Sequence, residues 1–140
     1  YSLRQAVARS LGIRPGARLA VVTVLSPSAS STTDANRSET TLQRQYLSRL
    51  KQWAQPLELH GHGVSFHVLE ATDVAQALVR YAQGNNVGLM ILGAATHGLH
   101  MQRLIATVPM RVARDAPCTV ILVKQQLPFA ALNGPDNGFA

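Results

Sequence analysis

Short apolar runs alternate along this chain with segments in which apolar residues recur three and four positions apart. The apolar runs have the length of strands and cover residues 17–25, 64–69, 87–92 and 118–123. The spaced pattern predicts helices at the N-terminus and over about residues 38–55, 73–84 and 107–116. Because helices and strands alternate without hairpin signals, we expect an α/β fold in which helices cover both faces of a parallel sheet.

Several residues mark the ends of the expected helices. Gly12 is the expected stop of the first helix and Pro56 that of the second. Asp73, with Gln76 three positions later, resembles a capping box, and Thr107 stands where the last helix needs its N-cap. These signals agree with the boundaries that the apolar pattern suggests.

Length and composition predict one folded domain. The chain has 140 residues, of which 46% are hydrophobic and 14% charged, values that exclude a disordered protein. We place the domain at residues 1–124 and expect a poorly ordered tail at 125–140, where Pro, Gly and Asn interrupt any regular pattern. The polar run at 26–33 is expected to be a loop.

No apolar run is long enough to cross a bilayer, and no signal peptide pattern opens the chain. Cys118 is the single cysteine, which excludes an internal disulfide and suits a reducing compartment. We therefore expect a cytoplasmic protein with no membrane partner, and we interpret Cys118 as a buried structural thiol.

The formal net charge is +6, so an acidic partner has to be considered. The basic residues nevertheless fall on different expected elements, with few aromatic residues between them: Arg14 and Arg18; Arg44, Arg49 and Lys51; Arg111 and Arg114. Nucleic-acid binding is therefore a lesser hypothesis, and most of these side chains are expected to be solvated.

Candidate chemistry centres on residues 87–123, where an expected strand leads into a glycine loop and then a helix. At this edge of a parallel sheet, backbone N–H groups and the helix dipole can hold an anion. Gly93 would allow close approach of a ligand, and His97, His100 and Arg103 could donate to phosphate oxygens. The alternative is that Gly93 only makes a turn and Thr107 only caps the helix.

We predict no catalytic residues and no metal site. No Asp or Glu occurs from residue 76 to residue 112, so the loop segment lacks a general base. The His60-Gly61-His62 sequence could contribute metal ligands, but no Cys or carboxylate stands beside it at a suitable spacing. A turn into the following strand is the favoured interpretation.

The segment from Gly88 to Val123 resembles the universal stress protein family. It has the strand, the Gly93 loop, the Thr107-Val108 helix start and the closing ARDAPCTVILV. The family signature is glycine, two residues, glycine, nine residues, then glycine followed by Ser or Thr, and Gly93 and Thr107 keep its overall spacing. The resemblance extends more loosely upstream and implies a Rossmann-like three-layer fold of the adenine nucleotide α-hydrolase type, with five strands.

Members of that family with the full signature bind ATP. The resemblance implies a nucleotide site in which Val24 and Leu92 face the adenine, while Gly93, Thr107 and Val108 surround the phosphates and ribose. Two signature glycines are replaced in this chain, by Thr96 and Ala106, while Gly98 is displaced by two residues. A Cβ at either position would hinder close approach to phosphate.

The leading hypothesis is therefore a non-catalytic regulatory or stress-response module without ATP or another cofactor. The alternative is an ATP-binding module with slow hydrolysis that uses the nucleotide site given above.

The resemblance also implies a central first strand, for which this sequence has no counterpart. A sheet without it would leave backbone groups unpaired, so either the strand precedes Tyr1 in a longer protein or another chain supplies it. We expect the first, with a fused or partner signalling domain upstream.

The last expected strand, residues 118–123, is uncharged and would lie at a sheet edge. Such an edge invites pairing with a second copy across a two-fold axis, as members of the family do. We expect a homodimer.

Overall fold

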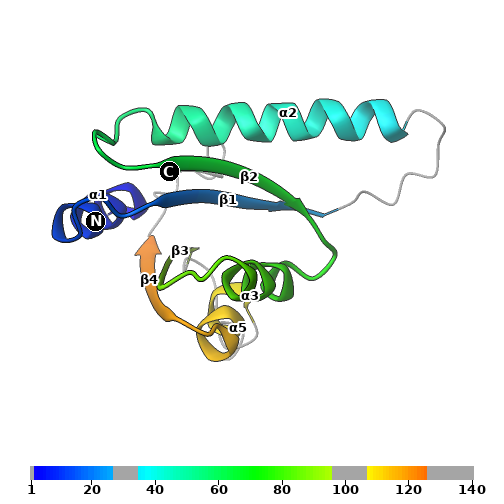
Figure 1. Ribbon diagram of the computed structural model, residues 1–140. Helices are drawn as coiled ribbons and strands as arrows, with labels where there is room; N and C mark the ends of the chain where they lie inside the picture. Colours follow the sequence, from blue (N-terminus) through cyan, green and yellow to red (C-terminus); the bar gives the residue numbers. More distant parts are fainter. Residues whose placement is uncertain (1, 27–34, 96–106, 126–140) are drawn as a thin grey trace.

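Helices and strands alternate along the chain as the apolar pattern predicts (Figure 1). The computed structural model describes residues 2–26, 35–95 and 107–125. In chain order its elements are α1 (Leu3–Ile13), β1 (Leu19–Leu25), α2 (Ala35–Ala54), β2 (Val64–Glu70), α3 (Val74–Gly84), β3 (Leu89–Ala95), α5 (Val108–Asp115) and β4 (Thr119–Gln125). All four expected strands and all four expected helices are present.

The four strands form two separate parallel pairs. β1 pairs with β2 from Leu19↔Val64 onward, and β3 pairs with β4 from Leu89↔Thr119 onward. Within the described residues no ladder joins the two pairs, so the expected single sheet is divided between β1 and β3.

The helices cover the strand pairs from both sides. α2 packs on β1 and β2, whereas α3 packs on β1 and on α5, which in turn lies against β3 and β4 (Figure 1). α1 also contacts β3 and β4, and Arg4 on this helix donates from Nε to the carbonyl oxygen of Trp53 in α2 over 3.0 Å. α1 therefore links the two strand pairs.

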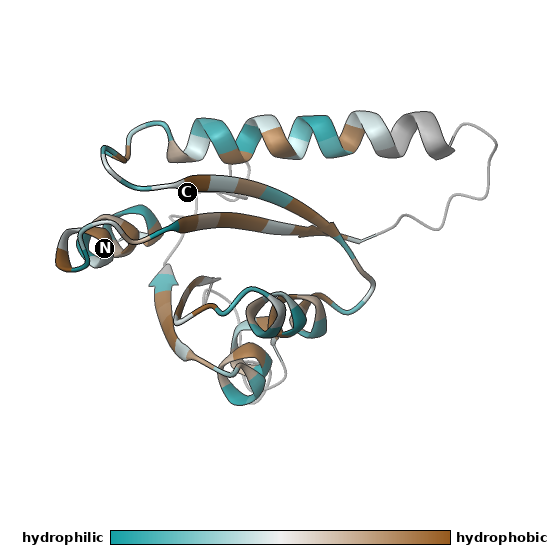
Figure 2. Ribbon diagram, in the orientation of Figure 1, coloured by the Kyte–Doolittle hydropathy of each residue, from teal (hydrophilic) through white to brown (hydrophobic). Residues whose placement is uncertain are grey.

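The main core lies between α2, α1 and the β1–β2 pair, where the apolar sides of these elements meet (Figure 2). Partly buried Phe66 and Val68 pack on it from one face of β2, as their alternation in the sequence predicts, and Ile91 reaches it from β3. The buried residues of this main core are Val7, Val21, Leu50, Trp53, Ala54 and Leu57.

The ends of α1 show which local signals decide helix limits. Ser2 and Gln5 form a capping box at its start, an S-x-x-Q signal that the sequence analysis missed. The helix continues past Gly12 to Ile13, so Gly12 is not the stop. Arg14 ends it because the residue before a proline is disfavoured in helical conformation, and Pro15 follows.

Other boundaries shift for similar reasons. The strand expected from residue 17 begins at Leu19, because the Ala17 N–H donates to the Arg14 carbonyl oxygen in a turn. Gly16 has a φ of 80° in that turn, which favours glycine. The expected loop at 26–33 lies outside the described residues from residue 27. The tail expected at 125–140 also lies outside the described residues, except for Gln125, which is the last residue of β4.

Cys118 is half-buried rather than buried, because it stands just before β4 between two exposed residues, Pro117 and Thr119. None of the helices in the described part of the chain has the length and apolarity needed to cross a membrane.

Candidate functional site

Gly93 belongs to a strand and not to a loop. The sequence pattern ends this strand at Leu92, but β3 continues to Ala95, and Gly93 pairs with Val123 of β4. The parallel ladder extends because β4 also continues, to Gln125, and offers partners to Ala94 and Ala95. The expectation that Gly93 opens the loop is therefore wrong.

The start of α5 is where the sequence predicts it. Thr107 is the N-cap residue, and its carbonyl oxygen accepts from the Arg111 N–H over 3.1 Å. Thr107 therefore holds the predicted N-cap position, but its side chain does not make the capping hydrogen bond that the prediction implies. Pro109 in the first turn lacks an N–H, which leaves Val108 and Met110 as the nearest backbone donors of this helix start.

Val24 and Leu92, the residues expected to face an adenine, are both half-buried. Val24 lies near the end of β1 and Leu92 in β3, so they belong to different strand pairs. The structure brings Leu92 and Gly93 onto the strand against which α5 packs, and leaves Val24 across the division. Five further residues that the sequence analysis considered lie outside the described residues: Thr96, His97, His100, Arg103 and Ala106.

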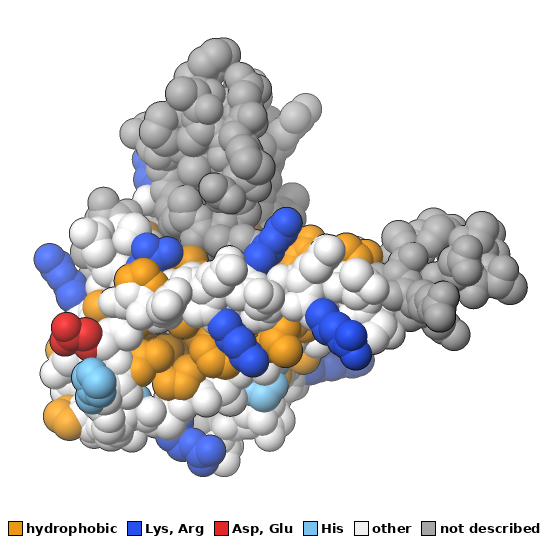
Figure 3. All heavy atoms as spheres, turned by 90° about the horizontal axis from the view of Figure 1, so that it is seen from above, with side chains coloured by type: hydrophobic (Ala, Val, Ile, Leu, Met, Phe, Trp, Pro, Cys, Tyr) orange, Lys and Arg blue, Asp and Glu red, His pale blue; other side chains and the backbone are white. Residues whose placement is uncertain are grey.

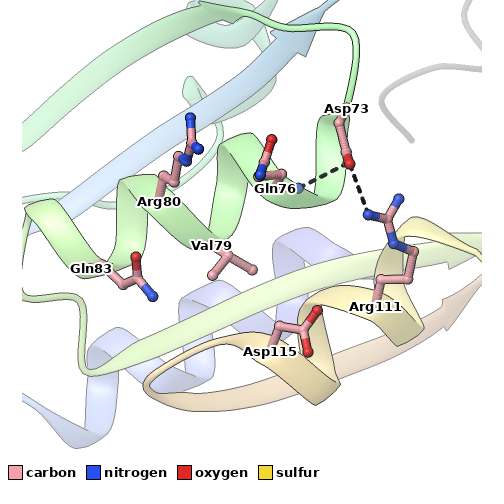
Figure 4. Close-up of a pocket in the computed structure, with 7 residues that line it drawn as sticks. All are labelled: Asp73, Gln76, Val79, Arg80, Gln83, Arg111 and Asp115. Atoms are coloured by element: carbon pink, nitrogen blue, oxygen red, sulfur yellow. Dashed lines mark hydrogen bonds and ion pairs between the residues drawn. The ribbon is translucent and has the colours of Figure 1, made fainter.

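A second, polar site is a groove of about 270 Å³ between α3 and α5, which the sequence analysis did not predict. Asp73 at the start of α3 and Arg111 on α5 point toward each other across it (Figure 4). The groove is lined by Asp73, Gln76, Val79, Arg80, Gln83, Arg111 and Asp115. The Asp73 capping signal was visible in the sequence, but its partner is 38 positions away, and no local pattern indicates it.

Asp73 makes two stabilising contacts at this site. One carboxylate oxygen accepts from the backbone N–H of Gln76 over 3.1 Å, as the capping pattern predicts, and the other pairs with Arg111 Nη2 over 2.9 Å. Both side chains are about two-fifths exposed, at 39% and 38%. The guanidinium, with help from the Gln76 N–H, lowers the pKa of Asp73 below its ordinary value, and the carboxylate raises that of Arg111.

The second carboxylate of the groove is also paired. Asp115 accepts from the neighbouring Arg114 over 2.8 and 2.9 Å, and this bond lowers the pKa of Asp115. Both carboxylates are therefore ionised and hydrogen-bonded at neutral pH, which makes them unsuited to accept or donate a proton there. The groove therefore presents two carboxylates, each paired with an arginine.

The His60-Gly61-His62 segment forms a turn, as expected. Gly61 has a φ of 80°, and His62 Nδ1 lies 2.7 Å from the carbonyl oxygen of Ala17, which ties the turn to the start of β1. Among the described residues there is no group of three or more His, Cys, Asp or Glu side chains that could hold a metal ion.

The described elements also follow the order and placement of a known family. A family model of the universal stress proteins matches residues 1–124. The chain belongs to the universal stress protein family. This finding confirms the resemblance that the Gly88 to Val123 segment carries, and with it the α/β fold.

Solved structures of universal stress proteins and of a similar protein have the same fold. A universal stress protein from Burkholderia pseudomallei is 22% identical over 86% of this chain and 83% of its own, with a TM-score of 0.59. A universal stress protein in complex with cAMP is 22% identical over 86% and 87%, with a TM-score of 0.61. The hypothetical protein MJ0577 is 15% identical over 90% and 88%, with a TM-score of 0.72. No functionally curated protein matches the chain.

Proposed function

We propose that this universal stress protein is a non-catalytic regulatory module that acts as a homodimer and does not bind ATP. The observation that carries the proposal is the replacement of two signature glycines by Thr96 and Ala106. Each adds a Cβ where the family signature has none, and an added Cβ hinders the approach of phosphate to the backbone. The single cysteine, Cys118, supports a reducing, cytoplasmic location.

The described part of the signature segment supports the same proposal. Gly93 is used in the β3–β4 ladder, and Pro109 removes one of the N–H groups that an anion would use at the start of α5. The two carboxylates of the neighbouring groove, Asp73 and Asp115, are both held by arginines. These features favour a binding role over proton transfer.

The dimer is proposed on the outer edge of β4. In the described residues this strand pairs only with β3, so its other edge is unpaired. Ile121 and Leu122 on it are 39% and 36% exposed, unusual values for large apolar side chains of a strand. The edge is uncharged from Thr119 to Val123, Lys124 near its end being the one charged residue of β4, and an edge of this kind pairs readily with its own copy.

Titration with a fluorescent ATP analogue tests the absence of ATP binding. We expect no saturable signal below millimolar nucleotide, and the same result by calorimetry with ATP and Mg²⁺. The double variant Thr96→Gly/Ala106→Gly, which restores the signature, is expected to bind more tightly than the wild type. Submillimolar wild-type binding that unlabelled ATP displaces would overturn the proposal.

A second candidate function is nucleotide binding at the predicted site, and the solved universal stress protein in complex with cAMP favours it. The site would use Val24 and Leu92 for the base, and Gly93, Thr107 and Val108 for ribose and phosphates. cAMP carries a single phosphate, so it needs less of the glycine signature than ATP does. Titration with cAMP in parallel with ATP, together with an assay of phosphate release, separates a nucleotide sensor from a slow ATPase.

Nucleic-acid binding has less support. Seen from the α2 side, Lys and Arg side chains are spread among uncharged ones and do not form one continuous patch (Figure 3). Two arginines of the described residues also lie over aromatic rings of the protein itself, Arg4 over Trp53 and Arg49 over Tyr46. We expect no retention on heparin at physiological salt.

A further inference from the structure

The α3–α5 groove contains one charged side chain that the rest of the site does not neutralise. Asp73 pairs with Arg111 over 2.9 Å. Asp115 pairs with Arg114, which stands next to it, over 2.8 Å. Arg80 lines the groove from α3 and has neither a hydrogen-bond nor an ion-pair partner among the described residues. The groove therefore retains a guanidinium whose N–H donors are not used by the described part of the protein.

Two amide side chains stand one helical turn from Arg80. Gln76 is four positions before it and Gln83 three positions after it, which is the spacing of residues on one face of a helix. Figure 4 shows this row along α3, with Asp73 beyond one end of it and Asp115 on the opposite helix. Because an amide both donates and accepts hydrogen bonds, a ligand held by Arg80 would find polar partners in both directions along α3.

The size and lining of the groove limit its ligand to a small polar molecule. The volume of about 270 Å³ lies just below the range of about 300–1,000 Å³ that is typical of sites for drug-sized ligands. Of the described residues that line the groove, Val79 alone is apolar, and it is already half-buried. A ligand would therefore bury little apolar surface here and would be recognised by its polar groups.

The charges of the groove favour an anion with a single negative charge. A guanidinium binds a carboxylate through two parallel hydrogen bonds, a geometry that gives affinity as well as orientation. Asp73 and Asp115 line the same groove, so a second negative charge on the ligand would lie near carboxylates that are already present. Arg80 can thus attract one carboxylate, whereas a dianion would be disfavoured.

We propose that the α3–α5 groove is a binding site for a small organic monocarboxylate, with the carboxylate bound by Arg80 and neighbouring polar groups of the ligand bound by Gln76 and Gln83. The site shares no residue with the predicted nucleotide site. It goes beyond the proposed function and does not depend on whether ATP binds.

Titration of the isotope-labelled full chain with acetate and with lactate tests the site. Backbone amide signals are followed by nuclear magnetic resonance at constant ionic strength, so that general screening does not contribute. Acetate is a minimal monocarboxylate, and lactate adds a hydroxyl group that the glutamine amides can bind. We expect saturable shifts in α3 and α5, with lactate binding more tightly than acetate. Shifts that do not saturate with either acid, or that spread evenly over the protein, would overturn the proposal.

Two kinds of control ligand define the specificity. Lactamide has nearly the size and shape of lactate without its charge, and we expect it not to bind. Succinate and inorganic phosphate carry more negative charge, and we expect both to bind more weakly than lactate because of Asp73 and Asp115. Lactamide that binds as well as lactate, or a dianion that binds more tightly, would overturn the proposed ligand class.

Protein variants complete the test. Arg80→Gln removes the charge but keeps a long polar side chain that suits a helix, and it should weaken lactate binding at least about tenfold. Arg80→Lys keeps the charge without the paired hydrogen bonds, so an intermediate loss is expected. Arg44→Gln, at an exposed position of α2, is the matched control and should bind as the wild type does. Circular dichroism checks that all three are folded.

Unchanged lactate affinity in Arg80→Gln would overturn the proposal. Titration of the same variant with ATP reports separately on the proposed function, because Arg80 is not part of the predicted nucleotide site.

Discussion

The two halves of the molecule are built from the same kinds of element but are buried to different extents. The half formed by α2, β1 and β2, together with α1, contains a core that includes Leu50, Trp53 and Leu57. In the half formed by α3, α5, β3 and β4, the side chains that are buried among the described residues are the small ones of Ala75, Ala82, Val112 and Val123. The large apolar side chains of that second half, such as Ile121, stay partly exposed.

This contrast shows where the molecule depends on partners. The first half buries its large side chains within one chain. The second half holds the family signature segment and leaves its large apolar side chains partly exposed, although in the described residues both strand pairs have unpaired edges. A second copy on the outer edge of β4 would increase burial in this half, so its stability is expected to depend more on association than that of the first half.

The largest expected effect is loss of the main core. Leu50 is only 3% exposed, and Leu50→Ala should lower the free energy of unfolding by about 2–5 kcal/mol, because it removes apolar contacts and leaves a cavity. Val112→Ala, at a fully buried site of the second half, should cost about 2 kcal/mol. Urea denaturation monitored by circular dichroism measures both. A larger loss in Val112→Ala than in Leu50→Ala would contradict the contrast between the halves.

An intermediate effect is expected on assembly. Ile121→Lys places a charge on the outer edge of β4, and in a two-fold dimer the two charges would lie near each other. The dimer dissociation constant should rise at least about tenfold, measured by sedimentation equilibrium. Leu89→Lys is the matched control, because Leu89 is equally exposed, at 38% against 39%, but lies on β3. A wild type that stays monomeric over a wide concentration range would refute the proposed dimer.

The smallest expected effect concerns the α3–α5 groove. Asp73→Ala removes both the helix cap and the ion pair with Arg111, whereas Asp73→Asn keeps a good N-cap and removes only the ion pair. We expect the melting temperature to fall slightly in Asp73→Asn and further in Asp73→Ala. Because both groups are well exposed, the contribution of the ion pair alone should be small.

The pH dependence of this effect follows from the lowered pKa of Asp73. A carboxylate whose pKa is lower in the folded than in the unfolded state stabilises the fold at neutral pH. This contribution is lost as the pH falls below about 4, the ordinary pKa of an aspartate in the unfolded chain, and then through the lower pKa of Asp73 in the folded state. The difference in melting temperature between wild type and Asp73→Asn should therefore shrink between pH 7 and pH 3. An unchanged difference would mean that the ion pair does not stabilise the fold.

The sequence is sufficient to predict the element order, because each element has its own apolar period. It also predicts the Asp73 and Thr107 helix starts, since capping depends on residues within one turn. The sequence pattern ends β3 too early because a glycine after an apolar run is typical of a loop, whereas in the structure Gly93 pairs with Val123 in the ladder with β4. That ladder is a contact between distant segments, which no local pattern contains.

The candidate site shows the same limit. Local signals predict that Thr107 and Val108 begin α5. The capping box of Ser2 and Gln5 at the start of α1 is also a local signal, and it could have been predicted in the same way. The Asp73–Arg111 pair could not, because it arises only when α3 and α5 pack together. The division between β1 and β3 could not be predicted either, because strand pairing is decided by contacts between distant segments.

The registers of the two strand pairs also bear on chain entropy. The β1–β2 pair joins Leu19 to Val64, 45 positions apart, whereas the β3–β4 pair joins Leu89 to Thr119, 30 positions apart. The shorter loop makes closure of the β3–β4 pair cheaper by about 0.4 kcal/mol, since the cost grows only with the logarithm of loop length. Chain connectivity thus slightly favours the less buried half. Its expected dependence on association therefore comes from the incomplete burial of its large side chains and not from the cost of loop closure.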